Sequence, residues 1–163
     1  QKDIIILNKV DFSKIQKIHQ IIPYNNQDRY FFGIDTGGAD DSTILTIVNM
    51  KGEMCIQYEP HGIDISTDIV KQSQQLIRII NKYQATGYVE RNGIGQGLYD
   101  ILSNEIGTRI YSWWASNESK NELVNNFNIE CAKGDISILD SNLAPKLDNE
   151  MSTYIVERTS SGN

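Results

Sequence analysis

Two acidic residues stand at the ends of short apolar runs, and glycines follow each of them. Asp35 ends the run YFFGID and is followed by Gly37 and Gly38, whereas Glu90 ends GYVE and is followed by Arg-Asn-Gly. Hard cations such as Mg²⁺ prefer oxygen ligands and usually take one or two protein carboxylates together with water and substrate phosphate. The two acids are therefore candidate metal ligands, although a carboxylate at a strand end is more often a turn former or a helix cap.

The segments around these acids predict a mixed sheet. Residues 30–35 are a short apolar run, 42–50 alternate and are rich in β-branched residues, and 53–58 follow a Lys-Gly turn, which predicts three antiparallel neighbours. A helix then carries the chain to further strands. Helices are expected on both faces, with Ser66 as the N-cap of the first helix and Asp68 in its first turn. If the strands that end in Asp35 and Glu90 are neighbours, the two carboxylates meet at one edge. The expected strands cover residues 30–35, 42–50, 53–58, 87–90 and 109–114, and the expected helices cover 66–83 and 93–102.

The two ends of the chain are less regular. Residues 1–28 read as a lead-in that contains a helix around 12–22. Near the other end, Ser119-x-x-Glu122 resembles a capping box, which predicts a helix start. Beyond it we expect a short strand at 136–139, a helix near 142–150 and a final strand at 153–157.

Composition limits the class of protein. The chain has 163 residues, of which 39% are hydrophobic and 22% charged, as in one ordinary globular domain. Its net charge of −6 argues against nucleic-acid binding over the whole surface, but a nuclease needs only a local basic path to phosphates. No apolar run approaches the roughly 20 residues that span a bilayer, so no membrane segment is expected. Cys55 and Cys131 follow no metal-ligand spacing and are expected to be buried, reduced thiols.

Two glycine patterns offer competing interpretations. Gly93-x-Gly95-x-Gly97 follows a strand as a dinucleotide loop does, but that loop requires a glycine where Leu98 stands. GIDTGG is also typical of the first phosphate loop of actin-like kinases, which would need a second phosphate loop and an adenosine motif. Neither is visible, and the sequence contains no Gly-x-x-x-x-Gly-Lys-[Ser/Thr] loop.

A resemblance to a known family sharpens these hypotheses. YFFGIDTGGADDST followed by GYVERNGIGQGLYDIL resembles the C-terminal nuclease domain of the large terminase subunit of tailed double-stranded DNA bacteriophages. SKNELVNNFNIECAKGDISILD and LAPKLDNEMSTYIVERTSSGN are similar to the same family, so the resemblance covers about residues 29–163. It implies an RNase H-like fold and an endonuclease that cuts concatemeric viral DNA during genome packaging, with two divalent metal ions, Mg²⁺ or Mn²⁺, held by three acids.

The resemblance assigns roles to particular residues. The first and second acids correspond to Asp35 and Glu90, and Asp41 aligns with an acid that could contact the outer shell of the metals, although Asp40 and Asp41 can both be plain turn residues. The third acid of the family follows a strand that here ends near Arg158, so we expect it beyond Asn163.

The resemblance also implies an organisation and partners. Residues 1–28 would be a linker from an upstream ATPase domain of the same polypeptide, and 29–163 a nuclease domain truncated at its C terminus. The implied partners are double-stranded DNA, the portal and the small terminase subunit, in the cytoplasm of a host bacterium, with no membrane.

Two alternatives remain open: a non-cutting DNA or portal docking module of the packaging motor, and another RNase H-like nuclease such as a junction resolvase. Arg91, Lys120 and Lys133 could touch phosphates or could be ordinary exposed side chains. At least one of Trp113 and Trp114, at the end of a strand, is expected in the core.

Overall fold

The computed structural model describes residues 2–4, 15–36, 43–62, 68–152 and 157–159. They belong to two compact units. One unit is Ile21–Ala115, and the other combines Gln1–Gln20 with Ser116–Asn163. Among the described helices, none is long and apolar enough to cross a membrane.

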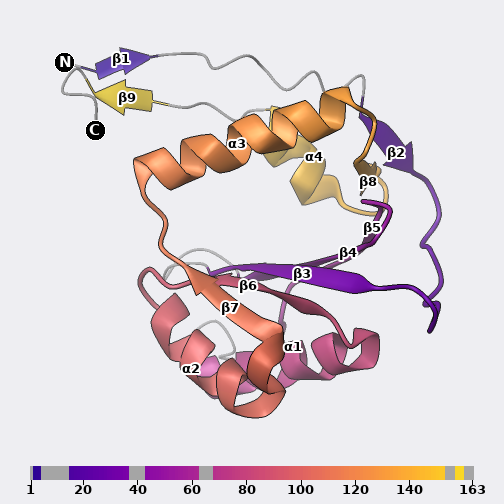
Figure 1. Cartoon of the computed structure of the whole chain (residues 1–163), viewed down its shortest axis with the longest axis vertical. Coiled ribbons are helices and arrows are strands. Elements are labelled where there is room, and N and C mark those ends of the chain that lie inside the picture. Colours follow the sequence, from indigo (N-terminus) through magenta and orange to yellow (C-terminus); the bar gives the residue numbers. More distant parts are fainter. Residues whose placement is uncertain (1, 5–14, 37–42, 63–67, 153–156, 160–163) are drawn as a thin grey trace. The chain divides into compact units, whose positions relative to one another are not determined.

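The unit Ile21–Ala115 is built on a five-stranded mixed sheet with the order β5-β4-β3-β6-β7 (Figure 1). The pairs β3–β4 and β4–β5 are antiparallel, whereas β3–β6 and β6–β7 are parallel. This arrangement confirms the predicted α/β class, with three antiparallel strands followed by parallel ones. The strands are β3 (Tyr30–Asp35), β4 (Ile44–Asn49), β5 (Met54–Tyr58), β6 (Thr86–Glu90) and β7 (Ile110–Trp113).

One face of this sheet carries the core. Along β3, every second side chain is buried, beginning with Tyr30, and Asp35 lies on the opposite, exposed side. Helices α1 (Ile69–Tyr83) and α2 (Gly95–Ile106) cover the buried face, and the short 3₁₀ helix η1 (Gly107–Arg109) leads into β7 (Figure 1). Each fully buried Leu or Ile contributes about 1.5–3 kcal/mol relative to an exposed one. The fully buried set includes Leu45, Ile47, Leu76, Ile80, Val89, Leu98 and Leu102.

The first helix begins later than the sequence predicts. Asp68 is the N-cap of α1, because its side chain accepts hydrogen bonds from the backbone N–H groups of Val70 and Lys71. These bonds stabilise the charged form and lower the pKa of Asp68. The prediction of Ser66 as N-cap is therefore wrong, and Asp68 precedes the helix instead of lying within its first turn.

In the second unit, which holds both ends of the chain, the described residues form two helices and two separate strand pairs. Strand β2 (Gln16–Ile18) is parallel to β8 (Ser137–Leu139), and β1 (Lys2–Ile4) is antiparallel to β9 (Glu157–Thr159). The helices are α3 (Asn117–Ala132) and α4 (Pro145–Ser152).

Two predictions for this unit need correction, and a third is tested at only one residue. The helix expected over 12–22 is wrong where the structure describes it, since residues 16–18 form the strand β2. Its partner strand lies more than 100 residues away, so no pattern in the neighbouring sequence predicts the pairing. The capping box at the start of α3 uses Ser116 and Ser119, not Ser119 and Glu122. The last strand is β9, which shares only Glu157 with the expected 153–157, and residues 153–156 lie outside the described ones.

Both cysteines are buried and free, as the sequence indicated. Burial raises the pKa of the Cys55 thiol and of the Cys131 thiol. Since the thiolate is the reactive form, both side chains are inert packing groups at neutral pH.

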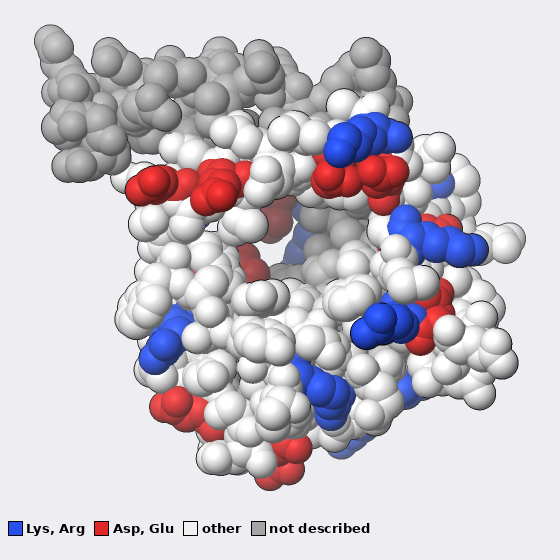
Figure 2. Space-filling view, in the orientation of Figure 1, with Lys and Arg blue, Asp and Glu red and all other residues white. Residues whose placement is uncertain are grey.

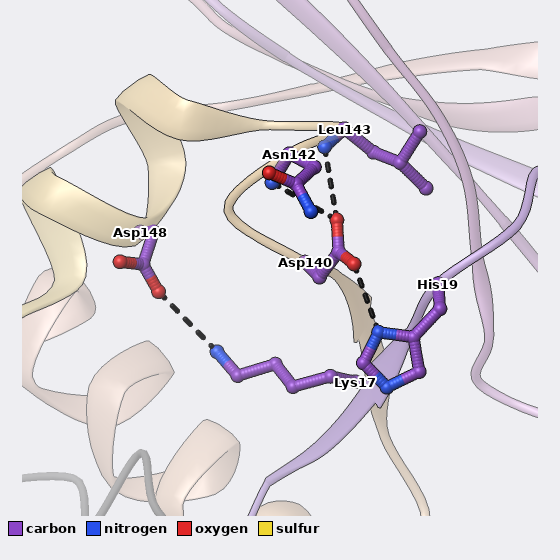
Figure 3. A network of polar contacts seen from close by, with 6 residues as sticks. All are labelled: Lys17, His19, Asp140, Asn142, Leu143 and Asp148. Atoms are coloured by element: carbon purple, nitrogen blue, oxygen red, sulfur yellow. Dashed lines mark hydrogen bonds and ion pairs between the residues drawn. The ribbon is translucent and has the colours of Figure 1, made fainter.

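A polar network at Asp140 joins β2 to the segment after β8 (Figure 3). His19 Nδ1 lies 2.8 Å from Asp140 Oδ2, and the backbone N–H groups of Asn142 and Leu143 donate to Asp140 Oδ1 at 3.0 and 2.9 Å. Lys17 Nζ forms a second link, 3.6 Å from Asp148 Oδ1. The bond to His19, followed by the bond from Leu143, lowers the pKa of Asp140.

The pKa of Asp140 gives a pH prediction. Because its folded pKa is depressed, the ionised carboxylate stabilises the fold above the ordinary aspartate pKa of about 4, and this contribution is lost as the pH falls further. We expect His19→Gln to raise the Asp140 titration midpoint, measured by NMR of the labelled carboxyl carbon. His61→Gln, in the other unit, is the matched control, and an equal shift in both variants would contradict the assignment.

Candidate metal and phosphodiester site

The strand register brings Asp35 and Glu90 to one end of the sheet. The last paired residues of β3 and β6 are Ile34 and Val89, and each acid is the next residue of its strand. Because the strands are parallel, both acids lie at the same edge. Side chains alternate along a strand, so both acids lie on the face that α1 and α2 do not cover, with Asp35 exposed and Glu90 half-buried.

The cross-strand partners of the acids complete a row at this edge. Asp35 is opposite Ile44 of β4, and Glu90 is opposite Trp113 of β7. Gly33 lies two residues before Asp35 on the same face of β3. No described atom lies within 4 Å of the position that a Cβ on Gly33 would occupy. Each acid therefore stands opposite an apolar cross-strand neighbour, and the described residues leave the space over Gly33, two residues before Asp35, open.

The chemistry of the two carboxylates fits a hard divalent cation, which takes oxygen ligands. Within the described residues, however, no group of three or more His, Cys, Asp or Glu side chains is placed to hold a metal ion. Asp40 and Asp41 lie outside those residues, so the structure gives no position for them. The described part of the chain thus supplies an acidic pair.

Glycines bring helix α2 against the strand ends that carry the acids. Gly93 has a φ of +58°, a left-handed conformation that favours glycine, in the turn after β6. A Cβ on Gly95 would lie 1.7 Å from the Glu90 carbonyl oxygen and 3.3 Å from Thr36 Oγ1. The first turn of α2 therefore sits directly on the ends of β6 and β3. Leu98, where a dinucleotide loop would need glycine, is fully buried.

A clamp made by Asn92 holds the loop after β6. Its amide donates to the Ala115 carbonyl at 3.0 Å, and its carbonyl oxygen accepts from the Ala115 N–H at 2.8 Å. The Arg91 N–H donates to the Trp113 carbonyl at 2.9 Å, which extends the pairing of β6 with β7. Sequence reasoning missed this clamp, because nothing local marks two residues that are 23 positions apart as partners.

The three basic residues that were predicted as possible phosphate contacts lie in two different units of the chain. Arg91 lies beside Glu90, whereas Lys120 and Lys133 are exposed residues of the other unit, at and after α3. Lys133 Nζ is 3.5 Å from Glu130 Oε1, an exposed ion pair of small energetic value. The expectation of a tryptophan in the core is wrong: Trp113 is half-buried and Trp114 is 61% exposed.

Strand order, mixed pairing and acids at the ends of two adjacent parallel strands define an RNase H-like α/β domain. Solved structures agree with this class. The large terminase nuclease from thermophilic phage G20c with bound magnesium matches at a TM-score of 0.77 and 16% identity, over 98% of this chain and 85% of that chain. Structures of the same phage nuclease with cobalt and with zinc match as well.

Two further terminases share the fold. The large terminase nuclease domain of bacteriophage SPP1 with bound Mn matches at a TM-score of 0.61 and 16% identity, over 93% of this chain and 85% of that one. The HK97 bacteriophage large terminase matches at 0.64 and 11% identity, over 100% of this chain but 39% of that one. No protein-family profile and no curated protein matches the chain. The chain thus has the fold of phage large terminase nuclease domains, which confirms at the level of fold the resemblance seen in the sequence.

The close approach of Gly95 predicts unequal effects of two glycine substitutions. Gly95→Ala places a Cβ against main-chain atoms and should lower the free energy of unfolding by about 1–3 kcal/mol or more. Among the described atoms a Cβ on Gly97 meets only Ile69 Cδ1, at 3.1 Å, so Gly97→Ala should stay within about 1 kcal/mol of the parent, because alanine favours helix. Urea unfolding followed by tryptophan fluorescence reports on this unit, and equal stability of the two variants would contradict the packing described.

Proposed function

We propose that this chain is the metal-dependent endonuclease domain of a phage large terminase, which cuts concatemeric double-stranded DNA during genome packaging. The observation that carries the proposal is the placement of Asp35 and Glu90 as the next residues after the Ile34–Val89 pair, on the same face. The shared fold supports it, since terminase nucleases with this fold have been solved with bound magnesium, cobalt, zinc and manganese.

The proposed chemistry is hydrolysis of a phosphodiester with two divalent ions, Mg²⁺ or Mn²⁺. Such ions activate a water and stabilise the leaving oxygen of an in-line displacement when they lie about 4 Å apart. Asp35 and Glu90 would hold them, with Asp41 as a further contact. Among the described residues the space over Gly33, two residues before Asp35 on the same face, is open to a substrate.

The proposed context follows from the same likeness. The HK97 large terminase is much longer than this chain, which supports an ATPase domain elsewhere in the same polypeptide. We place the division between the lead-in and the nuclease domain at residue 28. The portal and the small terminase subunit would be partners of the intact protein, in the cytoplasm of a host bacterium.

Supercoiled plasmid incubated with Mn²⁺ tests the proposed activity. Asp35→Asn and Glu90→Gln keep the shape of each side chain but remove its charge, so each should slow nicking by about 100-fold or more, because metal ions supply several kcal/mol of transition-state stabilisation. Glu105→Gln is the matched control, since Glu105 is an exposed carboxylate on α2, away from the strand ends.

Calorimetric titration with Mn²⁺ adds a readout independent of cutting. We expect weaker binding in Asp35→Asn and Glu90→Gln and unchanged binding in Glu105→Gln. Cutting and Mn²⁺ binding that persist in both site variants would rule out these residues as ligands.

A docking module that does not cut DNA is the second candidate. The observation in its favour is that the described residues bring together two candidate ligands and not three. A polypeptide extended at its C terminus separates the candidates. If it binds DNA or the portal but leaves plasmid intact in Mn²⁺, the docking role is favoured.

A further inference from the structure

Arg91 directly follows Glu90, and the structure holds its guanidinium in a fixed orientation. Arg91 Nε donates to Gln96 Oε1 at 2.7 Å, and Gln96 Nε2 in turn donates to Asp100 Oδ1 at 3.1 Å. Because Gln96 and Asp100 are one turn apart on α2, the bonds form a short chain along the helix surface. This chain fixes which edge of the guanidinium faces α2.

Two aromatic rings hold the same group. Arg91 Cζ lies 5.5 Å from the centre of the Tyr99 ring and 5.4 Å from that of Trp114, within cation–π range. The Asn92–Ala115 clamp fixes the segment that carries Trp114. An arginine held in this way loses little conformational freedom when a ligand binds, so binding costs less free energy.

The bonds leave the outer edge of the guanidinium available. Only Nε makes a hydrogen bond to the described residues; the two terminal nitrogens, with their four N–H donors, make none there, and no described carboxylate pairs with them. A planar guanidinium fork matches two phosphate oxygens in a bidentate geometry that lysine cannot reproduce. The arrangement is therefore that of an oriented anion receptor, on the residue that follows Glu90 and against the first turns of α2.

The charge of the chain makes a local receptor important. The net charge is −6, and Figure 2 shows acidic and basic side chains intermixed over the described surface that it draws. Two carboxylates at the site repel a DNA phosphate, so affinity requires cations close to them. Arg91 is the basic residue that directly follows Glu90 in the chain, and its guanidinium is held by Gln96, Tyr99 and Trp114.

We propose that Arg91 binds a backbone phosphate of the DNA at the Asp35–Glu90 site and that Gln96 is its positioning residue. This inference rests on the proposed nuclease function and deepens it. The Arg-Asn-Gly that follows Glu90 then has a divided role: Arg91 contacts the substrate, Asn92 anchors the loop, and Gly93 makes the turn.

Binding of a fluorescently labelled DNA duplex in EDTA, measured by anisotropy over a range of KCl concentrations, tests the contact without any cutting. Arg91→Ala should weaken binding by about 10-fold or more, as expected for a charged hydrogen bond. It should also reduce the slope of log affinity against log salt by about 0.9, the value for one phosphate contact. Arg78→Ala is the matched control, because Arg78 is an exposed arginine on α1, over the opposite face of the sheet.

Two milder variants separate contact from positioning. Arg91→Lys keeps the charge, so the salt slope should be unchanged while affinity and the Mn²⁺-dependent cutting rate fall. Gln96→Leu should do the same, and the double variant should be no worse than Arg91→Lys alone, because Gln96 acts through Arg91. Circular dichroism confirms that each variant is folded.

The outcomes distinguish this inference from the proposed function. Equal affinity and equal salt slope for Arg91→Ala and Arg78→Ala would overturn the phosphate contact. If the effects of Arg91→Lys and Gln96→Leu add in the double variant, the positioning role of Gln96 is overturned. Failure of the parent chain to cut plasmid counts against the nuclease proposal alone, since the binding series still decides whether Arg91 contacts phosphate.

Discussion

The parallel pairing of β3 with β6 is the constraint on which the candidate site depends. It fixes Ile34 opposite Val89 and so places Asp35 and Glu90 side by side at one edge, although they are 55 positions apart in the chain. A slip of one residue would move one acid to the other face, among the buried side chains under α1 and α2. The apolar pattern that fills the core thus also determines the register of the acids, since one face of the sheet must be buried.

The residues after Glu90 combine close packing with the orientation of a cationic side chain in one loop. Gly95 lets α2 begin directly against the carbonyl of Glu90, which gives Gln96 and Tyr99 their positions beside Arg91. Any larger residue at 95 would separate the helix from the strand end. The glycines of GIGQG therefore serve the placement of side chains around the acidic pair, in place of a nucleotide loop.

Much of the sheet could be predicted because its elements follow local rules. Alternating apolar residues and the turn before β5 define the antiparallel strands, and helical spacing defines α1 as the crossover that makes β6 parallel to β3. The predictions failed where the partner is distant. The segment Gln16–Ile18 has apolar neighbours at helical spacing, yet it pairs with β8, and only the folded chain brings that partner near.

The sequence by itself determined which chemical groups the candidate site contains: the carboxylates of Asp35 and Glu90, each at the end of an apolar run and followed by glycines, and the guanidinium of Arg91. The residue types give these chemical groups directly, and the periodicity that places each acid at a strand end depends only on neighbours a few positions away. The tertiary structure alone decided that Gln96, Tyr99 and Trp114 orient the guanidinium of Arg91. Those contacts arise when α2 and the end of β7 pack around one loop, and local spacing does not encode contacts between separate elements.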